Sequence, residues 1–78
     1  MTRSEARALI FAVIGEVAPN ADPSSLRGDE DMRVALDLDS MDFLNVLAGL
    51  HERSGIDVPD KDASKLFTLE GAIAYLAR

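Results

Sequence analysis

The sequence predicts an all-α fold: a four-helix bundle of three main helices plus a short third helix, with a long loop between the first two helices. Three segments repeat apolar side chains at the three-and-four spacing of one helix face, and no segment alternates convincingly as a strand does. The 78 residues include no cysteine, so the fold must depend on helix packing rather than on disulfides or thiolate metal sites. We expect residues 1–78 to form one domain, because a chain of this length has room for one modest core.

The first predicted helix ends before Pro19, which cannot continue a helix. Thr2 paired with Glu5, or Ser4 alone, is the candidate cap at its start. Its expected buried face comprises Ala6, Leu9, Ile10, Val13, Ile14 and Val17.

About twenty residues separate the first two helices, which is long for a structureless connection in a compact domain. This loop contains several apolar side chains that we expect to anchor it across the bundle: Leu26, Met32, Val34, Leu36 and Leu38. We therefore predict that much of the loop is ordered.

The second helix is predicted to begin at Asp39 or Ser40 and to end at Gly55, the residue type suited to a left-handed stop. Its expected buried stripe is Phe43, Val46, Leu47 and Leu50. Gly49 inside this helix costs about 1 kcal/mol relative to alanine, which indicates a need for a small side chain or a close approach there.

An extended connector containing Ile56, Val58 and Pro59 follows the second helix, and a short helical turn is expected from Asp60 to Leu66. Thr68 is the predicted cap of the last helix. The buried face of that helix is expected to hold Leu69, Ala72, Ile73 and Leu76.

The chain is acidic, with 14 Asp and Glu against 8 Lys and Arg, for a formal net charge of −6. This balance argues against nucleic-acid binding, which requires clustered basic side chains, and favours basic protein partners. No apolar run approaches the roughly 20 residues that span a bilayer. We expect a cytoplasmic monomer without a membrane span.

Ser40, where an acid-rich loop meets the second helix, is the candidate functional residue. A calcium loop starting at Asp37 fails, because Ala48 stands where a bidentate glutamate belongs. A hydrolase nucleophile needs a base, and the single histidine, His51, lies about 16 Å further along the helix at 1.5 Å per residue. We therefore predict neither catalytic residues nor a metal site. A purely structural interpretation, in which Asp39 and Ser40 only cap the helix, stays open.

From Leu36 to Leu76 the sequence resembles the acyl carrier protein family, whose second helix opens with an Asp-Ser-Leu-Asp type motif. The corresponding residues here are Asp39-Ser40-Met41-Asp42. The segment Gly55 to Asp60 is similar to the one after that helix in the family, and Thr68-Leu69-Glu70 leading to Ala74-Tyr75-Leu76 is similar to its final helix. The resemblance is weaker before Met32.

The resemblance implies that Ser40 carries covalent 4′-phosphopantetheine, attached by a phosphopantetheinyl transferase with coenzyme A, and that Asp39 helps this enzyme recognise the motif. Acyl groups would be held as thioesters and presented to acyl-loading ligases or synthases with basic docking patches. The expected pathways are fatty acid, polyketide or other specialised lipid biosynthesis. The expected partner-binding face comprises Met41, Asp42, Asn45, Ala48 and Glu52.

Departures from the family pattern favour a specialised free-standing carrier over the housekeeping carrier of fatty acid synthesis. Four residues dilute the acids of the second helix: Asn45, Gly49, His51 and Arg53. Ser54 stands where the family commonly has a bulky aromatic residue, and Phe43 and Phe67 are expected to compensate for it. Two alternatives remain: an aminoacyl or peptidyl carrier, and a cofactor-free helical interaction domain.

Overall fold

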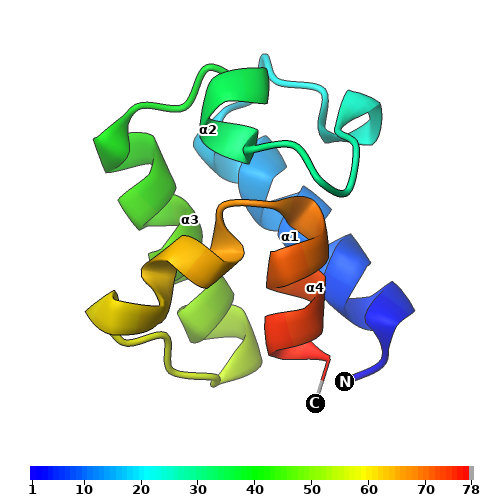
Figure 1. The fold of residues 1–78 in the computed structure, drawn as a ribbon, viewed down its shortest axis with the longest axis vertical. Helices are drawn as coiled ribbons and strands as arrows, with labels where there is room; N and C mark the ends of the chain where they lie inside the picture. The colour runs from blue at the N-terminus through cyan, green and yellow to red at the C-terminus, as the bar shows by residue number, and fades with distance from the viewer. Residues whose placement is uncertain (78) are drawn as a thin grey trace.

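A computed structural model describes residues 1–77 of the chain, and within them the secondary structure is helical. The α-helices are α1 (Arg3–Val17), α2 (Met32–Ala35), α3 (Ser40–Ser54) and α4 (Leu69–Leu76), and the 3₁₀ helices are η1 (Pro23–Ser25) and η2 (Asp60–Leu66). Figure 1 shows α2 and η1 together at the end of the bundle where α3 begins. The predicted helical bundle is confirmed, and η2 is its short third helix.

Helix α1 begins with the predicted capping box. The Thr2 hydroxyl accepts a hydrogen bond from the Glu5 backbone N–H, and the Glu5 carboxylate accepts one from the Thr2 N–H, at 3.1 and 2.8 Å. These bonds lower the pKa of Glu5. Thr68 caps α4 in the predicted way by accepting from the Gly71 N–H at 3.0 Å.

The core lies where α1 packs against both α3 and α4. Buried apolar side chains come from every predicted helical segment, and the largest fully buried ones are Ile10, Ile14, Met32, Leu50, Leu66, Leu76, Val13 and Val46. Three predicted core positions, Leu9, Val17 and Leu47, are only partly buried and pack at its edge.

Gly49 lies at a close contact between α1 and α3. This confirms the expectation that a small residue is needed at this position in the helix. A Cβ atom at Gly49 would lie 2.8 Å from Cγ1 of Val13, which is closer than two carbon atoms can pack. Val13 has few alternative rotamers because it is β-branched. The missing side chain therefore allows the two longest helices to approach each other.

The long loop between α1 and α3 is ordered, but one of its predicted anchors was wrong. Leu26, Met32 and Leu38 are buried and Leu36 is partly buried, whereas the Val34 side chain is 80% exposed. The reason is α2, a single helical turn that was not predicted from the sequence. It directs Met32 into the core and Val34 outward.

The end of α3 corrects the expectation for Ser54. Its hydroxyl donates to the Leu50 carbonyl at 2.6 Å and accepts from the Ile56 N–H at 3.0 Å, so it closes the helix end with hydrogen bonds. Phe43 lies in the first turn of α3, eleven residues from Ser54 and about 16 Å away along the helix. Phe43 and Phe67 contact each other there and do not compensate for Ser54.

Candidate functional site

Ser40 is the first residue of α3 and is exposed to solvent. Within residues 1–77 no hydrogen bond to its side chain is formed, so the hydroxyl is free to react. The first backbone N–H groups of a helix have no carbonyl partner within it, and they carry the positive end of the helix dipole. An anionic group attached to this hydroxyl would therefore be favoured by about 0.3–1 kcal/mol.

A reciprocal capping box fixes the backbone on both sides of Ser40. The Asp39 carboxylate accepts from the Asp42 N–H at 2.7 Å, and the Asp42 carboxylate accepts from the Asp39 N–H at 3.3 Å. The predicted start of the helix is thus confirmed, with Asp39 as its cap. The structural role of Asp42 was missed, although an acid three residues after a cap is the signature of such a box.

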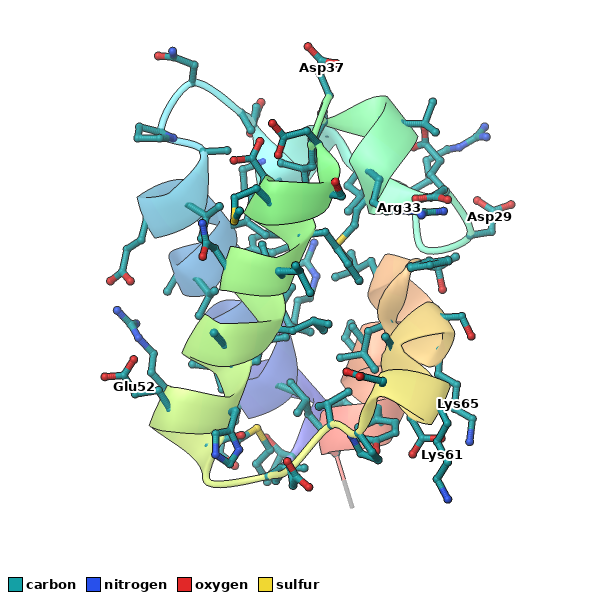
Figure 2. The ribbon with its side chains drawn as sticks, turned by 90° about the vertical axis from the view of Figure 1, so that its left-hand side faces the viewer. Asp29, Arg33, Asp37, Glu52, Lys61 and Lys65 are labelled. Carbon is teal, nitrogen blue, oxygen red and sulfur yellow. The ribbon has the colours of Figure 1, made fainter. Side chains whose placement is uncertain are left out.

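A short turn before Asp39 joins α2 to α3, and two backbone hydrogen bonds close it. The Leu38 N–H donates to the Arg33 carbonyl at 2.8 Å, and the Asp37 N–H donates to the Val34 carbonyl at 3.3 Å. This pair of bonds is a Schellman motif, which places its central residue in the left-handed region. That residue is Asp37, with φ of 55°, and Figure 2 shows it projecting from the turn.

Replacing Asp37 with glycine is expected to stabilise the protein by about 0.5–1 kcal/mol, because glycine adopts positive φ without steric cost. Alanine at the same position lacks this freedom, and it also lacks the short polar side chain that makes positive φ less costly for aspartate, so Asp37→Ala should lower stability. Urea unfolding of both variants tests the assignment. A lower midpoint for Asp37→Gly than for the wild type would contradict it.

The expected partner-binding face is exposed in the structure and is more apolar than predicted. Met41 is 63% exposed, and Asn45, Ala48 and Glu52 are also exposed, whereas Asp42 is partly buried. Leu44, which is 56% exposed one turn after Met41, was not predicted as part of this face. An apolar residue outside the buried stripe of α3 was the available signal for it.

Two of the four residues expected to dilute the acids of α3 have other roles. Gly49 faces Val13 of α1 rather than the partner-binding face. Arg53 forms an ion pair with Glu16 of α1. His51 is exposed, and its Nδ1 lies 3.1 Å from the Ile56 carbonyl, at the opposite end of α3 from Ser40.

A hollow of about 350 Å³ adjoins the start of α3. It is lined by Val17, Ala18, Pro19, Asn20, Ala21, Leu36, Asp37 and Asp42. The two carboxylates at this hollow make it a poor environment for a purely apolar chain.

Residues 1–77 contain no group of three or more His, Cys, Asp or Glu side chains placed to hold a metal ion. In the same part of the chain, no helix is both long enough and apolar enough to cross a membrane.

The chain is similar in sequence to proteins of known identity. It is 33% identical over 55 residues to the acyl carrier protein of Rubrobacter xylanophilus, covering 70% of this chain and 68% of that protein. It is 25% identical over 76 residues to the acyl carrier protein of Thermosynechococcus vestitus, covering 97% of this chain and 93% of the relative. The mitochondrial acyl carrier protein 2 of Arabidopsis thaliana is 27% identical over 77 residues, or 99% of this chain and 60% of that protein. No family model matches the chain.

Proposed function

Because the chain belongs to the acyl carrier protein family, we propose that it carries acyl groups as thioesters on a 4′-phosphopantetheine arm attached to Ser40. In the attachment step the Ser40 oxygen forms a bond to the phosphorus of the phosphopantetheine unit in coenzyme A. Adenosine 3′,5′-bisphosphate leaves, and the hydroxyl loses its proton. The thiol of the arm supplies the acyl-binding chemistry that a chain without cysteine lacks.

The observation that carries this proposal is the geometry of Ser40. Its hydroxyl is exposed at the start of α3, and no group within residues 1–77 forms a hydrogen bond with it. The capping bonds of Asp39 and Asp42 hold the surrounding backbone in one conformation, so a modifying enzyme meets a preformed turn. Their carboxylates repel a second anion, which favours a role in recognition by the basic residues or bound metal of the transferase rather than in holding the arm.

Partner enzymes are proposed to dock on the exposed side of α3 next to Ser40. Met41 and Leu44 offer apolar area, and Val34 of α2 is a further exposed apolar residue at the same end of the bundle. Asp42 and Glu52 add charge for basic patches, and Asn45 and Ala48 lie between them in sequence. An exposed apolar group with charges beside it is typical of a transient docking site.

The proposed setting is a specialised lipid or polyketide pathway in which this domain acts as a cytoplasmic monomer. The family consists of carriers rather than enzymes, so partner proteins supply the chemistry. An aminoacyl or peptidyl carrier uses the same attachment chemistry, and a cofactor-free interaction domain uses none. The mass of the protein isolated from its own cells distinguishes an acyl carrier from an aminoacyl or peptidyl carrier. The loading experiment distinguishes either carrier from a cofactor-free interaction domain.

Incubation with coenzyme A, magnesium and a broad-specificity phosphopantetheinyl transferase is expected to add one phosphopantetheine, detected by intact mass. Ser40→Ala should abolish this gain completely. Ser64→Ala is the matched control, because Ser64 is another exposed serine within a helix and should load as the wild type does. Absence of any gain in the wild type would refute the proposal, and a gain that survives in Ser40→Ala would assign attachment to another residue.

A further inference from the structure

Two aromatic rings meet beside the start of α3. Phe43 follows Ser40 by three residues, which is about 4.5 Å along the helix axis and on nearly the same side. Its ring centroid lies 5.2 Å from that of Phe67, the residue directly after η2, with 66° between the ring planes. This is the edge-to-face arrangement that aromatic pairs prefer.

Arg33 of α2 covers the Phe67 ring from outside. Its Cζ lies 3.4 Å from the ring centroid, and Figure 2 shows Arg33 near the turn that joins η2 to α4. Asp31 holds the guanidinium with two hydrogen bonds of 2.7 and 3.1 Å. These bonds raise the pKa of Arg33 and lower that of Asp31, so both groups stay charged over a wide pH range.

The backbone secures the same contact. The Met32 N–H donates to the Phe67 carbonyl at 2.8 Å, and Asp31 and Thr68 form an isolated antiparallel bridge. The Glu70 N–H donates to the Gly28 carbonyl at 3.0 Å. The loop before α3 is therefore tied to the turn between η2 and α4, and the Arg33 side chain has to break its two hydrogen bonds to Asp31 to leave the ring.

Fully buried core side chains adjoin these rings. Val46 lies one turn beyond Phe43 on the same side of α3, and Leu66 directly precedes Phe67; each is 1% exposed. A flexible chain attached at Ser40 that entered the core between α3 and η2 would have to displace the aromatic pair first. Phe43, Val46 and Leu66 belong to one buried apolar cluster against which Phe67 packs, so an entering chain would also have to part these side chains.

We propose that Phe43, Phe67 and Arg33 form a closed aromatic gate that keeps the carried group out of the bundle and exposed to partner enzymes. The inference rests on the proposed attachment at Ser40 and specifies how the cargo is held. The gate residues then leave short and long acyl groups in the same outer environment, so the bundle itself does not select among them by length.

The test compares the melting temperature of the protein loaded with acetyl- and with octanoyl-phosphopantetheine, transferred from the corresponding coenzyme A thioesters. For the wild type we expect no rise with chain length, since an exposed chain does not stabilise the folded state. Phe67→Ala removes the outer ring and leaves an apolar space that an octanoyl chain can fill. In this variant the octanoyl form should melt about 4–8 °C above the acetyl form.

Phe11→Ala is the matched control, because Phe11 also carries an arginine over its ring, Arg7 at 4.5 Å, but lies on α1. It should show no dependence on chain length. Phe67→Leu serves as the milder variant if Phe67→Ala does not fold, and a smaller rise is expected for it. A rise in the wild type, or none in the folded Phe67 variant, would overturn the gate.

Intact mass distinguishes this failure from failure of the proposed function. A protein that takes up no phosphopantetheine at Ser40 refutes the carrier function before any melting temperature is measured. A protein that is fully loaded but shows either contrary melting result leaves the carrier function intact and refutes the gate alone.

Discussion

Replacing Gly71 with alanine should destabilise the protein by about 2–4 kcal/mol, although alanine is the better helix former. A Cβ atom at Gly71 would lie 2.2 Å from the Lys65 carbonyl oxygen and 2.9 Å from the Thr68 hydroxyl. The carbonyl belongs to the backbone of η2 and cannot rotate away. The clash also displaces the Thr68 cap, which is itself worth about 1 kcal/mol.

Gly15→Ala provides the control, since Gly15 also lies inside a helix but a Cβ atom added there would meet no neighbouring atom of residues 1–77 within 4 Å. Here the gain in helix propensity should stabilise the protein by about 0.5–1 kcal/mol. Chemical denaturation of the two variants gives the comparison. Equal shifts in the same direction would mean that the contact between η2 and α4 is looser than described.

Leu38→Ala is expected to cost about 2–4 kcal/mol and to slow the loading of Ser40. Leu38 is 7% exposed and is the anchor between the Schellman turn and the cap of α3. Without its side chain the turn loses its hold on the core, and Ser40 two residues later loses its fixed position. Denaturation measures the first effect, and the initial rate of phosphopantetheine transfer, taken where the variant is folded, measures the second.

Val34→Ala is the control for this experiment because it removes an apolar side chain from the same loop. Val34 is 80% exposed, so the change in stability should stay within about 0.5 kcal/mol. A loss of stability in Val34→Ala as large as that in Leu38→Ala would contradict the distinction between anchor and surface residue.

This pair of residues also indicates how much could be predicted from the sequence. Helix periodicity predicted α1, α3 and α4, and cap residues such as Asp39 and Gly55 predicted where α3 begins and ends. Periodicity needs several turns to define a face, and α2 has a single turn. Val34 and Leu38 therefore looked equivalent in the sequence, although one points outward and the other into the core.

The start of α3 at Ser40, with Asp39 as its cap, was predictable, but the construction of the turn before it was not. A Schellman motif usually has glycine at its left-handed position, and that glycine is the signal in a sequence. Here Asp37 occupies the position instead. Contacts between distant segments leave no local signal either. The pairing of Phe43 with Phe67, and the cover that Arg33 provides, depend on how the loop folds back over η2.

The Schellman turn and the capping box have a consequence for the order of folding. The hydrogen bonds that orient Ser40 join residues no more than five positions apart, from Leu38 with Arg33 to Asp42 with Asp39. Such bonds close short loops and form quickly, whereas the core must bring together α1 and α4 from opposite ends of the chain. The turn that precedes Ser40 therefore closes at little cost in loop entropy, and the burial of Leu38 in the core then fixes it in place.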